Sequence, residues 1–100
     1  MRAKPIHPSE YFKKAIKGFT QTEIADKLGL SRLTVNQLCQ EKRCFTPETA
    51  LRCAKAFGTT PAFWLRLQIT HDIWVAEHAV NVSQIKLIEK LKLTKKERVR

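Results

Sequence analysis

Residues 20–38 constrain the fold of this chain most strongly, because two short amphipathic helix patterns meet there at a sharp break. Thr20 and Glu23 have the T-x-x-E spacing of a capping box, in which each side chain accepts a hydrogen bond from the other residue's backbone N–H. A helix can therefore begin at Gln21 with its first donors satisfied. Its apolar positions share one narrow face and are Ile24, Ala25 and Leu28.

A glycine turn separates this helix from a second one with a polar outer face. Gly29 suits the turn, because glycine adopts a left-handed backbone without a Cβ penalty. Ser31 can cap the second helix, in which Val35 and Leu38 are three positions apart and face inward. The polar side chains that point largely away from the core are Arg32, Thr34, Asn36, Gln37 and Gln40. This combination predicts a helix-turn-helix that contacts DNA through its second helix.

An ordinary pair of antiparallel helices is the alternative, because glycine ends many helices. Two spacings favour the helix-turn-helix instead: the small Ala25 lies four residues before Gly29, and the apolar Val35 lies six residues after it. A close crossing of two helices needs a small side chain at the first of these positions and a packing residue at the other.

The charge balance favours a polyanionic partner. The chain has 19 basic and 9 acidic residues, a formal net charge of +10, and basic side chains gain affinity for phosphates by releasing counterions. Binding to an anionic membrane would call for a basic helix with a broad apolar face, whereas the second helix exposes mostly amides and hydroxyls. Half of the net charge lies in residues 83–100, so the total says less about the helix pair than it first suggests.

Length and composition indicate a single cytoplasmic domain. One hundred residues can bury one core, and an apolar share of 43 % is ordinary for a globular protein. No stretch approaches the length of a membrane span, and the N-terminus lacks the apolar core of a signal peptide.

The three cysteines predict neither disulfides nor a metal site. Cys39, Cys44 and Cys53 form no C-x-x-C pair, and disulfides are rare in a reducing cytoplasm. A zinc site would have to recruit His71 or His78, but no paired ligand spacing is present. We therefore expect buried or half-buried free thiols, with no cofactor.

The remaining sequence continues the helical pattern. Start and stop signals predict helices over residues 8–19 and 47–57, closed by Gly18 and Gly58, and a third that begins at residue 61 and runs on through Val75. Near the C-terminus, Ile85 to Leu91 predict a short helix, with a strand as the alternative, and residues 94–100 a solvated basic tail.

Residues 68–82 contain no Lys or Arg, although they include Asp72 and Glu77. In so basic a chain, this gap predicts a face turned toward a second copy or a partner protein. Packing against the basic C-terminal segment explains the gap equally well. The residues expected on the dimer or partner surface are Ile73, Trp74, Val75, Glu77 and His78.

Four motifs occur in a fixed order: Q-T-E-I-A at 21–25, L-G-L-S at 28–31, T-P-E-T-A-L-R at 46–52 and F-W-L-R-L-Q at 63–68. Their arrangement resembles the HigA/VapI-type antitoxins, which are λ-repressor-like (XRE) helix-turn-helix proteins. The resemblance covers residues 7–78, and the F-W-L-x-L-Q block is its most discriminating piece.

The resemblance implies an all-α, λ-repressor-like five-helix domain, followed here by a basic C-terminal extension that falls outside the shared pattern. We assign residues 1–82 to the domain and 83–100 to the extension. The family also implies a homodimer on a palindromic double-stranded DNA operator, repression of the shared operon and neutralisation of a HigB-type ribosome-dependent mRNA interferase. The alternative is a stand-alone helix-turn-helix transcriptional regulator without a toxin partner.

An enzyme is not expected. The sequence has no clustered carboxylates for a metal, and its adjacent pair His71-Asp72 would diverge on a helix. One departure from the family concerns the end of the second helix, where Gln40-Glu41 replace the usual Asn-Gly before Lys-Arg. If that position needs a left-handed backbone, Glu41 costs on the order of 1 kcal/mol; the alternative is that the helix simply ends differently.

The predicted DNA contacts fall into two groups. Base contacts need side chains that reach into the major groove from the second helix, whereas phosphate contacts fix the register of the protein on the duplex. The predicted base contacts are Arg32, Leu33, Thr34, Asn36 and Gln37. The predicted phosphate contacts are Gln21, Thr22, Gln40, Lys42 and Arg43.

Overall fold

Five α-helices form in the part of the chain that the computed structural model describes, residues 3–89, 93–94 and 97. In chain order they are α1 (Pro8–Ala15), α2 (Gln21–Leu28), α3 (Arg32–Cys39), α4 (Pro47–Phe57) and α5 (Pro61–Ala79). These residues contain no strand. The prediction of an all-α, five-helix domain is therefore confirmed.

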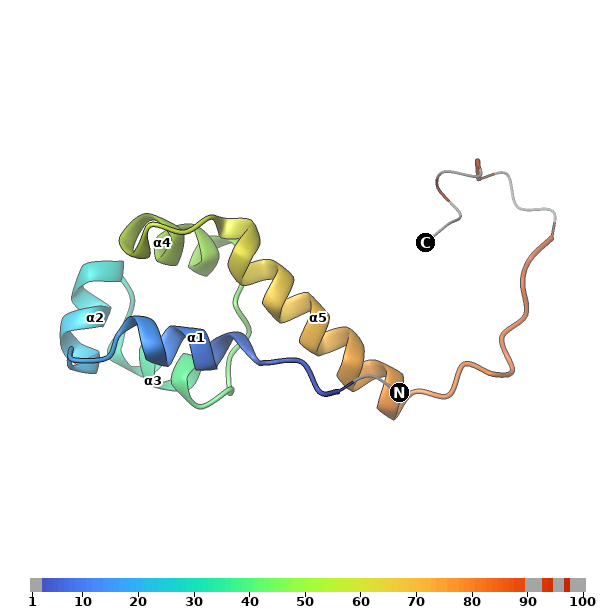
Figure 1. Ribbon diagram of the computed structural model, residues 1–100, viewed down its shortest axis with the longest axis horizontal. Coiled ribbons are helices and arrows are strands. Elements are labelled where there is room, and N and C mark those ends of the chain that lie inside the picture. Colours follow the sequence, from blue (N-terminus) through green and yellow to red (C-terminus); the bar gives the residue numbers. More distant parts are fainter. Residues whose placement is uncertain (1–2, 90–92, 95–96, 98–100) are drawn as a thin grey trace.

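The helices have an uneven layout. Figure 1 shows α1 to α4 gathered at one end of the molecule, with α5 leading away from them as one long helix. The buried residues of α5 are Trp64, Gln68 and His71, so only its first part belongs to the core. None of the described helices has the length and apolar content needed to cross a membrane.

α4 and α5 begin at the predicted residues, Pro47 and Pro61, each with a threonine cap directly before the proline. The Thr46 hydroxyl accepts a hydrogen bond from the Thr49 N–H at 3.3 Å, and the Thr60 hydroxyl accepts one from the Phe63 N–H at 3.1 Å. Each bond satisfies a backbone donor that the first turn of a helix leaves without a partner. These caps fix the directions of α4 and α5.

The core forms where α1 to α4 meet the start of α5. Val35 and Leu38 are fully buried, and Trp64 is 1 % exposed. The Phe45 ring stacks on Trp64 with a centroid separation of 5.4 Å. The Trp64 indole N–H donates to the Thr59 hydroxyl at 2.8 Å, which supplies the partner that a buried indole needs.

A buried amide ties α5 to the loop after α3. The Gln68 Oε1 accepts a hydrogen bond from the Phe45 N–H at 2.8 Å, and the Gln68 Nε2 donates to the Asp72 carboxylate at 2.9 Å. Gln68 is only 6 % exposed, so both of its bonds replace water. The loop that carries the basic residues after α3 is therefore anchored to the core.

Three expectations need correction. α1 ends at Ala15, with Ile16 as its C-cap, rather than continuing to Phe19. Cys44 is exposed, although half-buried Cys39 and buried Cys53 agree with the prediction. The third correction concerns the C-terminal segment.

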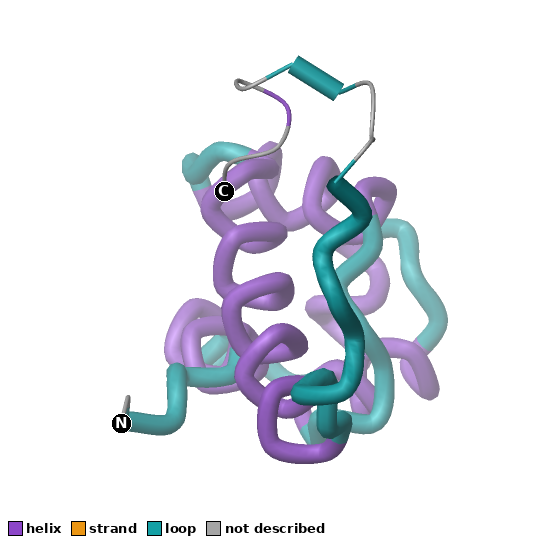
Figure 2. Tube along the Cα trace, turned by 90° about the vertical axis from the view of Figure 1, so that its right-hand side faces the viewer, coloured by secondary structure: helices purple, strands orange, loops and turns teal. Residues whose placement is uncertain are grey.

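Residues 85–89 are not helical, so the predicted helix over Ile85 to Leu91 is wrong there, and its last two residues lie outside the described part of the chain. Ile85 and Leu87 are each 75 % exposed. A short helix without packing partners is marginal in water, because nucleation costs more than a few hydrogen bonds return. Figure 2 shows residues 80–89 as loop, in front of the helices.

Candidate nucleic-acid interface

α2 begins with the predicted capping box. The Glu23 N–H donates to the Thr20 hydroxyl at 3.1 Å, and the Thr20 N–H donates to the Glu23 carboxylate at 2.8 Å. The negative charge of Glu23 also lies at the positive end of the helix, which is favourable. The buried residues of α2 are those predicted: Ile24, Ala25 and Leu28.

The turn between α2 and α3 has the predicted backbone. Gly29 is left-handed, with φ of 70°, and the Leu30 N–H donates to the Ala25 carbonyl at 2.9 Å. Ser31 then caps α3, accepting a hydrogen bond from the Thr34 N–H at 3.0 Å. The Ser31 and Thr34 hydroxyls also lie 2.8 Å apart, so the Thr34 side chain is held against the start of α3.

α3 has one face in the core and one toward solvent. Val35 and Leu38 are its buried residues, whereas Leu33 is 63 % exposed and Arg32 is exposed. Thr34, Asn36 and Gln37 are half-buried. The predicted outward side of the helix therefore faces solvent at its N-terminal end and is partly packed further along.

Two amides on this outer side have side-chain partners. The Asn36 Nδ2 donates to the Gln21 Oε1 at 3.2 Å, a bond that joins α3 to the start of α2. The Gln37 Oε1 accepts from the Arg43 Nε at 3.0 Å and from its Nη2 at 2.7 Å. The Arg43 guanidinium therefore fixes the orientation of the Gln37 amide.

A left-handed residue, Glu41, follows the C-cap of α3, so the first of the two possibilities raised by the sequence holds. Glu41 has φ of 60°, and the Lys42 N–H donates to the Gln37 carbonyl at 2.9 Å. This five-residue return is the backbone pattern that glycine usually supports at a helix end. The turn leaves Lys42 and Arg43 exposed.

Arg52 of α4 is a supporting residue that the sequence analysis did not assign. Its Nη1 donates to the Leu28 carbonyl at 2.9 Å and to the Gly29 carbonyl at 3.2 Å, and its Nη2 lies 2.9 Å from the Glu48 carboxylate. The four-residue spacing of Glu48 and Arg52 predicts an ion pair within α4. No local sequence pattern predicts the contact of Arg52 with the end of α2.

The model of the HTH_3 family, described as helix-turn-helix, matches residues 12–64, which is more than half of the chain. The chain belongs to this helix-turn-helix family. Proteins similar to this chain are named as HTH-type transcriptional regulators and antitoxins, and one of them is solved with its operator DNA. The family is thus one of helix-turn-helix regulators and antitoxins, in agreement with the prediction of a non-enzymatic protein.

Two curated relatives illustrate the membership of this helix-turn-helix protein. An uncharacterized HTH-type transcriptional regulator, YbaQ of Escherichia coli (strain K12), is 39 % identical over 62 residues, which are 62 % of this chain and 55 % of YbaQ. Antitoxin HigA-1 of Vibrio cholerae is 32 % identical over 76 residues, 73 % of this chain and 71 % of the antitoxin. The matched segment thus spans only about half of YbaQ.

Solved structures agree with these relatives. An addiction module antidote protein of the HigA family from Coxiella burnetii superposes with a TM-score of 0.77 at 32 % identity, covering 86 % of this chain and 99 % of that one. Pseudomonas aeruginosa antitoxin HigA, solved with the higBA promoter, gives 0.71 at 30 % identity, covering 87 % and 99 %. The resemblance to HigA-type antitoxins is confirmed.

Residues 68–82, the stretch of the chain without Lys or Arg, are largely exposed. Ile73 is 48 % and Val75 43 % exposed, and the His78 ring stacks on half-buried Trp74 at 4.0 Å between centroids. The described residues 83–89 are exposed themselves, so the alternative in which they pack over this stretch is not supported. The apolar side chains on α5 remain open to a partner.

His7 and His71 line one hollow together with Glu41, which follows α3. The His7 and His71 rings meet edge to face at 4.6 Å, and the His7 Nδ1 accepts a hydrogen bond from the Ser9 N–H at 3.0 Å, which caps α1. Burial lowers the pKa of His7, a nearby His71 lowers it further, and the Glu41 carboxylate opposes both. The lowered pKa favours the neutral form of His7, the form in which Nδ1 can accept the Ser9 hydrogen bond.

The described residues contain no cluster of three or more side chains placed to hold a metal. Burial raises the pKa of the Cys53 thiol to about 12 and also raises that of Cys39. Both thiols therefore stay protonated and poorly reactive, because the thiolate is the nucleophile and metal ligand.

Proposed function

We propose that this helix-turn-helix protein is a sequence-specific DNA-binding antitoxin that represses its own operon. The observation that carries the proposal is the exposed N-terminal part of α3. Ser31 caps this helix, and Val35 and Leu38 anchor it in the core. Recognition helices of this motif enter the major groove with their N-terminal residues at the base edges. The structure of the similar Pseudomonas aeruginosa antitoxin HigA with the higBA promoter supports DNA binding by a protein of this fold.

Five side chains of α3 are proposed to contact bases. Arg32 is exposed at the first helical position and can bond a guanine bidentately, and Leu33 can pack against a thymine methyl. Asn36 donates one amide hydrogen to Gln21 and keeps another, together with Oδ1, which is the pair that adenine needs. The full set is Arg32, Leu33, Thr34, Asn36 and Gln37.

Gln37 is proposed to act as a donor to bases. Because Arg43 occupies the Gln37 Oε1, the amide presents its N–H groups. Guanine O6 and N7 or thymine O4 accept such donors, whereas bidentate recognition of adenine also needs Oε1. Recognition of adenine would therefore require Arg43 to release Gln37.

The proposed phosphate contacts lie at the two ends of the motif. Gln21 and Thr22 are at the N-terminus of α2, where the helix dipole and free N–H groups favour an anion. Lys42 and Arg43 follow α3 and are exposed. Such contacts fix register without selecting sequence. The full set is Gln21, Thr22, Gln40, Lys42 and Arg43.

We propose a homodimer that uses the far end of α5. Ile73 and Val75 are 48 % and 43 % exposed, and a second copy would cover them. A two-fold dimer would place its α3 helices on the half-sites of a palindromic operator. The proposed surface is Ile73, Trp74, Val75, Glu77 and His78, within a domain of residues 1–82 followed by the extension 83–100.

The proposed protein partner is a HigB-type mRNA interferase, which the antitoxin would neutralise in the cytoplasm. The similarity to antitoxin HigA-1 supports this proposal. A stand-alone transcriptional regulator is the second candidate, supported by the similarity to YbaQ. Co-expression with the neighbouring reading frame decides between them: a co-purifying small toxin favours the antitoxin, and its absence favours the regulator.

A gel shift tests the DNA-binding proposal. The probe is the DNA upstream of the chain's own reading frame, and the competitor is random DNA of equal length. We expect a shift that survives competition and weakens steeply with salt, because phosphate contacts release counterions. No shift at low salt would contradict the proposal.

A further inference from the structure

We propose that the surface between α2 and α4 is a docking groove for an acidic, amphipathic segment of a protein partner. Two adjacent hollows form it, and they share Lys27, Leu28 and Ala56. The first continues to Phe19 and Phe57. The second continues to Leu51. We call this surface the α2–α4 groove.

The floor of the α2–α4 groove is apolar and accessible. Leu51 is 60 % and Phe19 49 % exposed, and Phe57 is half-buried and packs against the core. Large apolar side chains that gather around a hollow differ from isolated exposed ones, because an occupant can remove several from water at once. The occupant therefore needs apolar side chains of its own.

Every charged side chain that lines the groove is positive: Lys27, Arg52 and Lys55. Arg52 is already committed to Glu48 and to the end of α2. Neither lysine has a carboxylate partner among the described residues, and the Lys27 ammonium lies 5.8 Å from the centre of the Phe19 ring. Because two unpaired ammonium groups lie beside an apolar floor, a complementary occupant would carry carboxylates next to apolar side chains.

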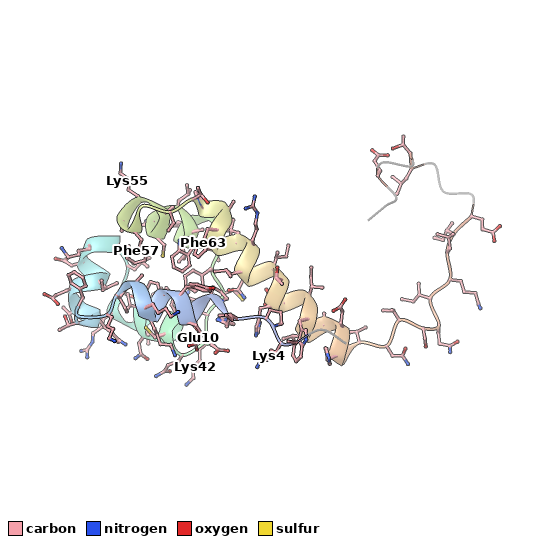
Figure 3. All side chains as sticks on the ribbon, viewed as in Figure 1. Lys4, Glu10, Lys42, Lys55, Phe57 and Phe63 are labelled. Atoms are coloured by element: carbon pink, nitrogen blue, oxygen red, sulfur yellow. The ribbon has the colours of Figure 1, made fainter. Side chains whose placement is uncertain are left out.

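The groove lies away from the proposed DNA surface. α4 packs mainly on α5 and α2, and Figure 3 shows Lys55 projecting from the opposite side of the molecule to Lys42. An apolar floor is also a poor match for a phosphate backbone. None of the groove residues belongs to the proposed DNA contacts, so this proposal stands or fails separately from DNA binding.

Selection from a displayed library of random 16-residue peptides on the full-length protein tests the chemistry of the occupant. The groove variant is Lys27→Glu with Lys55→Glu. The control is Lys14→Glu with Lys86→Glu, which has the same net charge and changes exposed lysines outside the groove. Circular dichroism checks that both variants fold.

We expect the enriched peptides to carry Asp or Glu beside apolar residues at helical spacing. A labelled peptide from the selection should bind at least tenfold more weakly to the groove variant and within twofold of wild type to the control. Enrichment of basic or neutral peptides would overturn the proposal, as would equal weakening in both variants, because the latter indicates general charge attraction. If the groove variant instead lost self-association by sedimentation, a second copy would be the occupant and the proposal would be wrong.

Discussion

The ends of α2 and α3 use the same backbone turn with different residues. At the first, φ is 70° at Gly29 and the Leu30 N–H returns to the Ala25 carbonyl at 2.9 Å. At the second, φ is 60° at Glu41 and the Lys42 N–H returns to the Gln37 carbonyl, also at 2.9 Å. Positive φ alone therefore does not explain why only one of them is glycine.

The surroundings of the two turns explain the difference. A Cβ built on Gly29 would lie 2.6 Å from the Arg52 Nη1, the atom that donates to the Leu28 and Gly29 carbonyls. Glu41 is exposed, so its side chain has room. At the end of α2, a side chain would meet both a left-handed backbone and the Arg52 guanidinium. At the end of α3, Glu41 meets only the strain of the left-handed backbone.

The largest effect should come from Gly29→Ala, with Gly58→Ala as its matched control. Gly58 has φ of 72°, and a Cβ added there would have no atom within 4 Å. The Gly58→Ala variant should therefore have an unfolding free energy about 1 kcal/mol below that of wild type, from backbone strain alone. Gly29→Ala should lose about 2 to 3 kcal/mol, because the Arg52 hydrogen bonds are disturbed too. Urea unfolding measures both, and equal losses would show that crowding by Arg52 is unimportant.

Glu41→Gly should stabilise the protein, whereas Gly29→Ala and Gly58→Ala should destabilise it. Relief of the left-handed backbone should raise the unfolding free energy by about 1 kcal/mol relative to Glu41→Ala. The alanine variant is the control, because it removes the carboxylate and keeps the strain. A glycine variant no more stable than the alanine variant would mean that the turn is unstrained.

A smaller effect should come from the charge that Glu41 has and Gly29 lacks. The pKa of His7 is lowered from 6.5 mainly by burial, against the pull of the Glu41 carboxylate. The unfolded chain thus binds a proton at His7 before the folded protein does, so stability falls as the pH drops below about 6.5. NMR titration should show that Glu41→Gln lowers the pKa of His7 further. An unchanged value would rule out the electrostatic contact.

The sequence predicts these turns well because their signals are local. The Thr20–Glu23 box, the glycine after α2 and the substitution at Glu41 all act through neighbours within six residues, and the structure has each of them. A local pattern predicted wrongly at residues 85–89, which are exposed and not helical, because a short helix needs packing partners to form.

The supporting contacts were not predictable, because they join residues far apart in the chain. Arg52 reaches a carbonyl 24 positions away, and Gln68 reaches the Phe45 N–H 23 positions away. His7 caps α1 although histidine is not a preferred capping residue. The Arg52 and Gln68 contacts depend on how the helices pack, which no spacing within one helix specifies. The His7 cap is local, and only its residue type hid it.

The central claim is that the N-terminal end of α3 selects DNA sequence, and Arg32→Ala tests it most directly. Fluorescence anisotropy would compare wild type and variant on the preferred operator and on random DNA at the same salt concentration. We predict a loss of about 1–3 kcal/mol on the operator and little change on random DNA, because a base contact contributes only where its base is present. An equal loss on both DNAs would contradict the account, since Arg32 would then contact only the phosphate backbone.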